Sequence, residues 1–289
     1  MSLTIDPKKN VHGKNLVEYA AKTKGGARVT FDSLVNEYWV FRDRFDDIHD
    51  LQDDSIRIAV KALNDYRRVG LPVFDKLDNA GQKNLGFTIM EEFFYHLFDK
   101  MMRFSGVNAK NIFVGKGNSY VSLSFTPSSF KTLFKQPGAY IHTKDQDFVL
   151  GAAVDVSVTA DESTRAMSTV IPAVAIECKT YLERNMLDSC AATARRLKNA
   201  MPYCVYIVAA EYMKMSEASP ELTDIDEVYV LCRKKNSERE ARKKQGLPPF
   251  DIDAELILDL YHRVLRHINA IWWNPSDAVE TGKIINRPS

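Results

Sequence analysis

The chain has 289 residues, 45% of them hydrophobic and 27% charged, which is the composition of a folded globular protein and not of a disordered chain. Its 39 Lys and Arg residues nearly balance 38 Asp and Glu residues, so any basic surface for nucleic acid must be local. The four cysteines form no CxxC pair and the N-terminus carries no apolar leader, which argues against a zinc site, a secreted protein or a membrane span and predicts a reduced, cytoplasmic protein.

The N-terminal third of the chain has the pattern of helices. Apolar residues recur at three- and four-residue spacing within residues 31–69 and again over about residues 85–102. Such a stripe buries one face of a helix against a core. The stripe of the second segment consists of Leu85, Ile89, Phe93 and Leu97. We therefore expect a helical N-terminal region over residues 1–80, followed by a second unit.

The middle of the chain changes to the two-residue alternation of strands. Residues 111–127 are interrupted by Gly115 and Gly117, which predicts a hairpin within that segment. Residues 147–160 and 170–182 have the pattern of two strands separated by the polar turn DESTRAMST. This order predicts an antiparallel hairpin.

A strand–helix–strand unit follows the hairpin. The pattern predicts a helix from about Leu182 to Asn199, then a fully apolar strand, MPYCVYIVAAE, and a further strand, EVYVLC. Such a unit favours parallel strands joined by a right-handed crossover. The expected fold class is α/β (α+β), with a mixed central sheet flanked by helices. A last helix is expected from about Ile252 to Trp272.

Residues 233–244 form a basic run between the last strand and the last helix. The run contains seven basic and two acidic residues, a local charge of +5. Such a run either follows a nucleic-acid backbone or forms a solvated loop.

One charged pair ends an otherwise apolar strand. In IPAVAIECKTYL the strand period places Glu177 and Lys179 on the same face as Ala173 and Ala175, opposite Ile176. A half-buried carboxylate and ammonium group need partners, because an unpaired buried charge is strongly destabilising. A divalent metal ion and a phosphate group would supply these partners, and the alternative is a structural ion pair at the end of a strand.

The hydrolysis of a phosphodiester needs this kind of arrangement. A metal ion held by carboxylates neutralises charge at phosphorus and generates hydroxide at neutral pH, and hard oxygen ligands suit Mg²⁺. A lysine two residues after the carboxylate can orient the attacking water and contact the phosphate. Glu177 and Lys179 are therefore candidate catalytic residues, with Glu177 as a metal ligand.

A second carboxylate must come from the preceding strand, where Asp145, Asp147 and Asp155 are the candidates. A regular hairpin about the middle of the polar turn would bring Glu177 nearest to Asp155. A bulge, a longer strand or an off-centre turn near Glu162 would instead align Asp147. The spacing by itself leaves this choice open.

The sequences KDQDF, IECKTYL and ARRLK resemble type II restriction endonucleases of the PD-(D/E)xK superfamily, and in particular a subunit of the heterodimeric enzymes typified by BbvCI. The resemblance is firmest over residues 140–210. On its pattern Asp147 is the superfamily aspartate, Glu177 is the (D/E) position and Lys179 is the lysine. Gln146 stands where the literal motif has proline, which leaves the other two aspartates as alternatives.

The resemblance implies a Mg²⁺-dependent, site-specific deoxyribonuclease of a bacterial restriction–modification system. Each subunit of such a heterodimer cuts one strand of a short, specific double-stranded DNA site. A PD-(D/E)xK catalytic domain with a C-terminal helix is implied over residues 81–289, with Asp147 and Glu177 as metal ligands. The partner is a homologous second subunit, or the chain self-associates. Superfamily members often add an acidic residue from the first core helix, here Glu91 or Glu92, and the helical stripe favours Glu92.

Two other functions fit the same residues less well. One is a structure-specific or repair nuclease of the same fold, and the other is a non-catalytic DNA-binding subunit. An intact set of Asp147, Glu177 and Lys179 argues against the second. Lys116 and Lys144, which are expected in loops near the site, are candidate phosphate contacts or solvated side chains.

Overall fold

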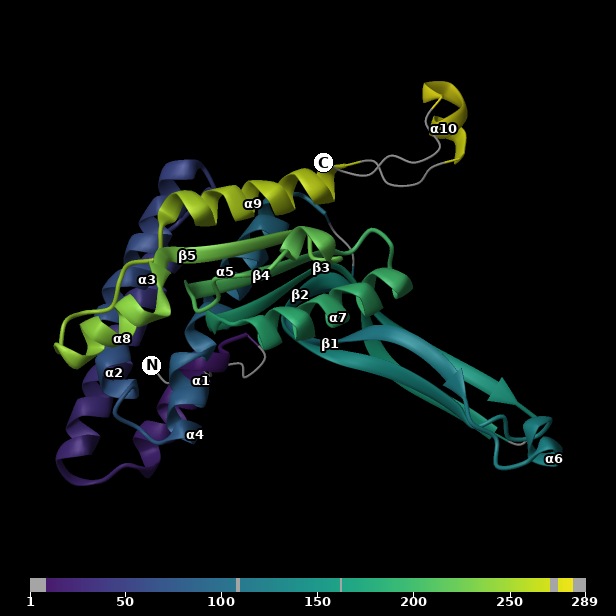
Figure 1. The fold of residues 1–289 in the computed structure, drawn as a ribbon, viewed down its shortest axis with the longest axis horizontal. Helices are drawn as coiled ribbons and strands as arrows, with labels where there is room; N and C mark the ends of the chain where they lie inside the picture. Colours follow the sequence, from purple (N-terminus) through teal and green to yellow (C-terminus); the bar gives the residue numbers. More distant parts are fainter. Residues whose placement is uncertain (1–8, 108–109, 162, 271–274, 283–289) are drawn as a thin grey trace.

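The computed structural model describes residues 9–107, 110–161, 163–270 and 275–282. Its five strands form one sheet in the order β1-β2-β3-β4-β5 (Figure 1). β1 and β3 each pair antiparallel with β2, whereas β3, β4 and β5 are parallel, which confirms the predicted mixed sheet and its antiparallel hairpin. The strands are β1 (Ile112–Phe125), β2 (Ala139–Ala160), β3 (Ser163–Leu182), β4 (Val205–Met213) and β5 (Glu227–Lys235).

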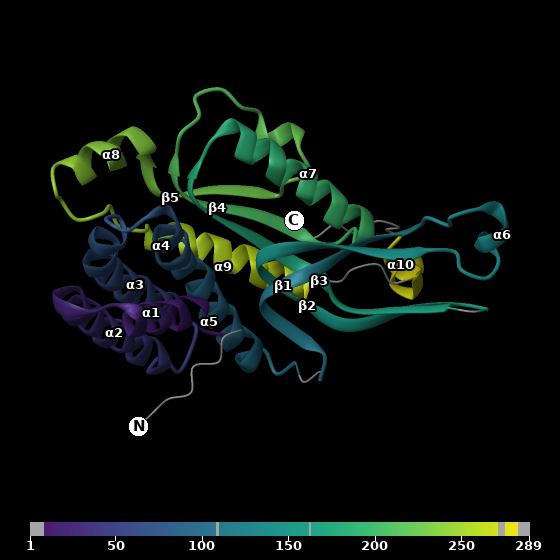
Figure 2. The ribbon, with the colours of Figure 1, turned by 90° about the horizontal axis from the view of Figure 1, so that it is seen from below.

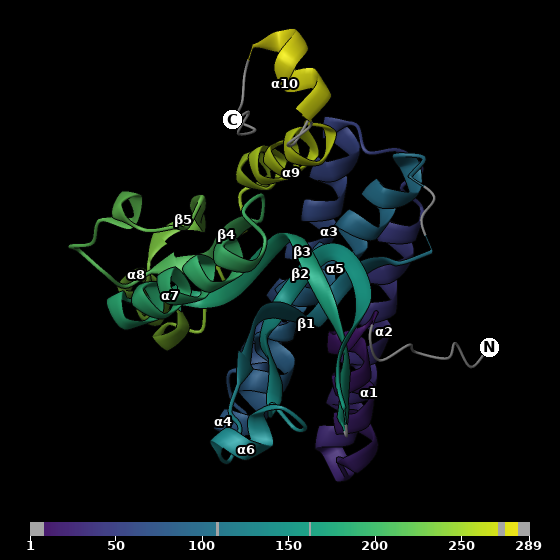
Figure 3. The same cartoon turned by 90° about the vertical axis from the view of Figure 1, so that its right-hand side faces the viewer.

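Long helices cover one face of the sheet, and Figure 3 shows them on the opposite side from α7. Their buried side chains share one core with Phe148, Ile176 and Ile207 of the sheet. The helices expected within residues 31–69 and 85–102 are present in this group. The group consists of α1 (Val11–Lys22), α2 (Gly25–Asp46), α3 (Asp53–Phe74), α5 (Thr88–Phe104) and α9 (Ala254–Asn269).

The other face of the sheet packs against α7 (Arg184–Ala200). Leu187 and Leu197 of this helix share a second core with Ala175 of β3 and with Tyr206 of β4. The faces of β3 therefore alternate as the sequence predicted: Val174 and Ile176 face the long helices, whereas Ala175 faces α7.

The remaining helices are short. They are α4 (Asn79–Gly81), the π-helix η1 (Gln82–Gly86), α6 (Phe130–Leu133), η2 (Pro220–Leu222), α8 (Asn236–Lys244) and α10 (Pro275–Thr281). The basic run therefore contains a helix and is not simply a loop. α9 ends at Asn269, and the end expected at Trp272 lies outside the described residues. Nowhere in the described ranges is a helix both long and apolar enough to cross a membrane.

The hairpin expected within residues 111–127 is wrong. That segment is a single strand, β1, which pairs with β2 along most of its length. The pairing register shifts between Gly115 and Gly117, and Gly115 has a φ of 120°, a conformation that favours glycine. The glycines therefore mark a bulge within a continuous strand and not the turn of a hairpin.

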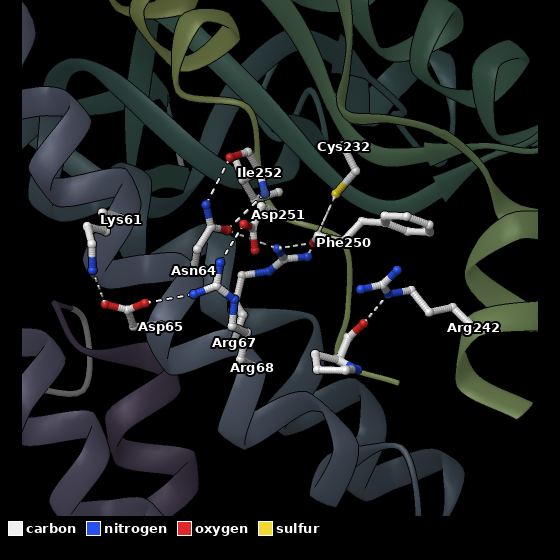
Figure 4. Close-up of polar contacts among 11 residues, drawn as sticks. Lys61, Asn64, Asp65, Arg67, Arg68, Cys232, Arg242, Phe250, Asp251 and Ile252 are labelled. Carbon is white, nitrogen blue, oxygen red and sulfur yellow. Dashed lines mark hydrogen bonds and ion pairs between the residues drawn. The ribbon is translucent and has the colours of Figure 1, made fainter. Parts of the chain in front are cut away.

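Two side chains of α3 join the helical region to the sheet and to the segment before α9 (Figure 4). Asn64 donates to the carbonyl oxygen of Ile252 at 2.9 Å and accepts from its N–H at 2.8 Å. Arg67 donates to the carbonyl oxygen of Phe250 at 3.0 Å and forms a buried ion pair of 2.5 Å with Glu211 of β4. These contacts place the helices relative to the strand ends that carry the candidate site.

Candidate active site

A bulge in the β2–β3 hairpin decides which residues meet at its inner end. The pairing register shifts between Leu150 and Gly151. A side chain at position 151 does not fit, because a Cβ there would lie 2.0 Å from the carbonyl oxygen of Ile171. A shift of one residue moves every following side chain of a strand to the other face. The glycine therefore sets the register of all the residues that precede it in β2.

This register places Asp147 beside the end of β3. Phe148 pairs with Ile176, and the next residues along the two strands are Asp147 and Glu177. The backbone N–H of Cys178 donates a hydrogen bond of 3.0 Å to Asp147 Oδ2. Of the alignments that the sequence left open, the structure combines two: an off-centre turn, with Ala160 paired to Ser163, and a one-residue bulge at Gly151.

The other two candidate aspartates lie away from this point. Asp155 is exposed in the outer part of the hairpin, where it accepts a hydrogen bond of 2.6 Å from Ser168. Asp145 is exposed and pairs with Asn118 of β1. The pairing of Ala160 with Ser163 bears out the alternative of an off-centre turn, although Glu162 itself lies outside the described residues.

Glu177 and Lys179 form a close ion pair at the end of β3. Lys179 Nζ lies 2.5 Å from Glu177 Oε1 and 4.0 Å from Asp147 Oδ2. Burial raises the pKa of Glu177, and the charge of Asp147 raises it further. Burial lowers the pKa of Lys179, but the two carboxylates outweigh this effect and the net shift is upward. Lys179 is therefore held as an ammonium group beside two carboxylates that repel each other.

Two further charged groups reach Asp147 from its other side. Lys116 of β1 lies 3.0 Å from Glu91 Oε2 of α5 and 3.9 Å from Asp147 Oδ1. Glu91 is buried, and its burial together with the charge of Asp147 raises its pKa to about 7. The site thus contains three carboxylates, whose mutual repulsion is offset by the ammonium groups of Lys116 and Lys179. Lys116 is a strand residue and not, as expected from the sequence, a loop residue.

The expectation that Glu92 rather than Glu91 approaches the site is wrong. Glu92 is 1% exposed and faces the core of the helical region. It accepts hydrogen bonds from the Tyr38 hydroxyl at 2.7 Å and from the Gly13 N–H at 2.9 Å. The apolar stripe of α5 packs against helices as well as against the sheet, so alignment with that stripe does not identify the side that faces the strand ends.

The four residues Glu91, Asp147, Glu177 and Lys179 line a cleft of about 1010 Å³. Lys144 of β2 also lines this cleft. α8 also lines the cleft, through Arg239, Arg242 and Lys243. The sequence indicated this basic run but did not indicate that it lines the same cleft as the carboxylates.

The α8 side chains are already arranged by neighbours. Lys243 lies 3.3 Å from Asp75 Oδ1, and Arg242 stacks over the Phe250 ring with 4.5 Å between its guanidinium carbon and the ring centroid. Arg239 pairs with Glu240 at 3.0 Å. Such contacts restrict long side chains before a ligand arrives, which lowers the entropy cost of binding.

The donor set of the site fits a hard cation that is not fully enclosed by protein. Glu91, Asp147 and Glu177 offer carboxylate oxygens, the ligands that Mg²⁺ prefers. Across the described ranges, no three His, Cys, Asp or Glu side chains stand close enough together to form a complete ligand cluster. Mg²⁺ is commonly held by one or two carboxylates and completes its shell with water and substrate phosphate. Burial, and after it the charge of Asp147, raise the pKa values of Glu91 and Glu177, and a bound cation would favour the ionised form of both.

Comparisons with known proteins bear on the same region. The family model described as Bpu10I restriction endonuclease matches residues 82–282. No curated protein matches the chain significantly. A solved structure described as the native BbvCI A2B2 tetramer at low resolution superposes with a TM-score of 0.68 and 22% sequence identity, over 92% of this chain and 98% of that chain. At this identity the likeness shows a shared fold, and it confirms the predicted fold class.

Proposed function

The chain belongs to the Bpu10I restriction endonuclease family, and from this premise we propose that it cuts one strand of a short, specific double-stranded DNA site by Mg²⁺-dependent phosphodiester hydrolysis. The observation that carries the proposal is the meeting of Asp147, Glu177 and Lys179 at the inner end of the β2–β3 hairpin. These groups come from two strands, and Glu91 joins them from α5. They lie in a cleft with basic residues on its walls.

Each residue has a role that its surroundings support. Asp147 and Glu177 are proposed as the metal ligands, and the Cys178 N–H holds the Asp147 carboxylate in place. A bound divalent cation would neutralise charge on the scissile phosphate and promote ionisation of a water molecule. Lys179 is proposed to donate hydrogen bonds to the attacking water and to a phosphate oxygen.

Glu91 and Lys116 are proposed to adjust the charge of the site. Lys116 pairs with Glu91 at 3.0 Å and lies 3.9 Å from Asp147. Arrival of a divalent cation favours the ionised form of Glu91, whose pKa of about 7 lies near neutral pH. Lys116 is then available to shift toward a phosphate oxygen.

The substrate is proposed to be duplex DNA that enters the cleft between Lys144 and α8. Arg239, Arg242 and Lys243 would contact phosphates, which supply most of the salt-dependent binding of proteins to DNA. The partner is proposed to be a homologous subunit, because the BbvCI structure of similar fold is described as an A2B2 tetramer. One active site in each subunit would then account for cleavage of both strands.

The test is strand-resolved cleavage by the assembled enzyme. The chain and its homologous subunit are incubated with supercoiled plasmid and Mg²⁺, and the products are mapped on both strands. Glu177→Ala in this chain alone is expected to convert linear product into plasmid nicked on one defined strand. Equal loss of both cuts would contradict one site per subunit.

The same assay separates the alternatives. A structure-specific nuclease would cut branched or flapped DNA in preference to a plasmid site. A non-catalytic DNA-binding subunit would leave the double-strand cut unchanged when Glu177 or Lys179 is replaced.

A further inference from the structure

A long β-arm leaves the body of the molecule next to the cleft. It comprises residues 119–144, which are the outer part of β1, the segment that contains α6, and the first residues of β2; we call it the basic arm. Its strands pair from Ser119 with Lys144 to Phe125 with Ala139. Figure 2 shows α6 at the tip of this arm, at the opposite end of the molecule from α8.

The charge of the basic arm differs from that of the rest of the chain. The basic arm contains three Lys residues and no Arg, Asp or Glu, a charge of +3 in a chain whose net charge is only +1. Within the arm, Lys131, Lys135 and Lys144 are exposed. The positive charge is therefore concentrated on an element that projects into solvent.

The neighbouring hairpin provides an internal comparison. The outer parts of β2 and β3 form a second projection, visible beside the basic arm in Figure 2. From Asp155 to Arg165 its sequence has three acidic residues and one basic residue. The basic arm is therefore positively charged, whereas the second projection is not.

The tip of the basic arm carries exposed aromatic side chains. Phe130 is 76% exposed and Phe134 is 67% exposed, and their rings contact each other edge to face with centroids 5.3 Å apart. Phe125 and Tyr140 at the ends of the paired strands are also exposed. Aromatic side chains next to lysines suit a DNA groove, where the rings contact sugars and bases and the ammonium groups contact phosphates.

We propose that the basic arm is a second DNA-binding surface, which lies along the duplex outside the cleft with Lys131 and Lys135 on phosphates and Phe130 and Phe134 in a groove. This inference rests on the proposed function. Lys144 lines the cleft and belongs to the arm, so the two surfaces are continuous.

The length of the arm defines its reach along DNA. Eight residues separate Ala139 at the tip from Asp147 in the site. At ~3.3 Å per residue this is about 26 Å, or about eight phosphates along one strand at ~3.4 Å each. Contacts of the arm therefore fall in DNA that flanks the cleaved phosphate.

A protein partner explains these observations less well. An apolar protein interface accounts for the exposed aromatic side chains but does not require that acidic residues be absent from the whole arm. A polyanion accounts for both features, because every carboxylate near the phosphates would be repelled.

The experiment measures binding of the full-length chain to a labelled random-sequence duplex of about 40 base pairs, long enough to extend beyond the arm. Fluorescence anisotropy is followed over a series of NaCl concentrations without divalent metal. Lys131→Ala/Lys135→Ala is compared with Lys22→Ala/Lys24→Ala, which removes the same charge near the α1–α2 turn, far from α6 in Figure 1. The arm variant is expected to reduce the slope of log K against log[salt] by about two, whereas the control leaves the slope unchanged.

A second variant separates DNA from a protein partner. Phe130→Ala/Phe134→Ala is expected to weaken binding by a constant factor at every salt concentration and to leave the sedimentation coefficient of the chain unchanged. Trimming the duplex to the length covered by the cleft is expected to abolish the difference between wild type and both arm variants.

The outcomes are distinct. Equal slopes for the Lys131/Lys135 variant and its control overturn the inference while wild-type binding still supports the proposed function. A changed oligomeric state of the Phe130/Phe134 variant, with DNA affinity unaltered, assigns the arm to a protein partner and also overturns it. If the wild-type chain does not bind the duplex at any salt concentration, the proposed function fails as well.

Discussion

The backbone N–H of Cys178 donates a hydrogen bond of 3.0 Å to Asp147 Oδ2. Cys178 stands between Glu177 and Lys179, so a peptide group of the ExK segment itself holds the aspartate. Because a backbone donor cannot rotate away as a side chain can, the separation between the two carboxylates depends on the pairing of β2 with β3. Any change that alters this pairing is therefore expected to move Asp147 relative to Glu177.

Replacement of Asp147 by Asn is expected to reduce Mg²⁺-dependent cleavage by at least about 100-fold, since even groups that only support a metal ligand commonly change activity by 10–100-fold. Asp155→Asn, a matched change at an exposed position of the same strand, is expected to leave cleavage unchanged. Initial rates on plasmid DNA provide the measurement. The opposite ranking of the two variants would assign the metal to Asp155.

Substitution of Glu91 is expected to impair cleavage, whereas substitution of its neighbour Glu92 is expected to lower the unfolding free energy. Glu91→Gln removes a carboxylate whose pKa is raised to about 7, so at pH 8 the substitution should leave the unfolding free energy unchanged or increase it. The Mg²⁺ concentration that gives half-maximal cleavage is expected to rise about 10-fold or more. Glu92→Gln weakens buried hydrogen bonds from Tyr38 and Gly13 and should lower the unfolding free energy by about 1.5–3 kcal/mol. Urea unfolding and Mg²⁺ titration of both variants check the contrast, and a shared loss of stability would contradict it.

Gly151→Ala is expected to disturb the register that aligns Asp147. A Cβ at this position would lie 2.0 Å from the Ile171 carbonyl oxygen, so the two strands must separate, at a cost of about 1–3 kcal/mol or more. The cleavage rate is expected to fall even at a temperature where circular dichroism shows that the variant is folded. Gly26→Ala in α2, where nothing lies within 4 Å of the added methyl group, is the control. A fully active Gly151 variant would show that the bulge does not set the site.

His12 is expected to make the folded state sensitive to mild acid. It is buried, and its burial lowers its pKa from 6.5 to about 4, although Glu92 opposes this shift. Between these values the unfolded chain binds a proton that the folded chain does not, so stability falls as the pH decreases through this window. The contribution of His12 lowers the unfolding free energy by about 3 kcal/mol near pH 4.

The measurement for His12 is urea unfolding of wild type and His12→Gln at several pH values from 7.5 to 4.5. The wild type is expected to lose its advantage over the variant as the pH falls, because Gln does not titrate. A constant difference across this range would contradict the assignment.

Removal of Arg67 is expected to destabilise the contact between the helical region and the sheet. Arg67→Met leaves Glu211 buried without its partner, which should lower the unfolding free energy by about 3–5 kcal/mol. Adding Glu211→Leu is expected to recover a large part of this loss, because no buried charge then remains unpaired. Thermal and urea unfolding of the two variants test the coupling, and additive losses would show that the pair does not act as a unit.

Local sequence patterns determined much of the architecture. The two-residue alternation of β3 predicted that Glu177 and Lys179 share a face opposite Ile176, and the structure confirms it. The long helices and the mixed sheet were also predictable, because the side-chain period of a helix or strand is a property of the backbone and is visible within a short stretch of sequence.

The glycines of β1 show where such local reasoning fails. Gly115 and Gly117 interrupt an alternating segment, and both a turn and a bulge produce that pattern. The choice between them depends on whether another strand is available to pair along the whole segment. Here β2 begins at Ala139, earlier than its alternation indicated, and pairs with β1 throughout.

The assembly of the site was decided by contacts between distant parts of the chain. Asp147 rather than Asp155 meets Glu177 because the hairpin turns early, with Ala160 paired to Ser163, and because the bulge at Gly151 then shifts the register by one residue. Register depends on the partner strand as much as on the strand itself. Glu91 reaches the site because α5 is oriented on the sheet so that this side chain, and not Glu92, points toward Asp147.

The Glu177 and Lys179 pair was therefore determined by its own strand, since two residues on one strand face are neighbours in any fold that keeps the strand. The carboxylates and basic walls around the pair come from other elements. Only tertiary packing brings those elements within reach, because no local period of the sequence encodes the distance between them.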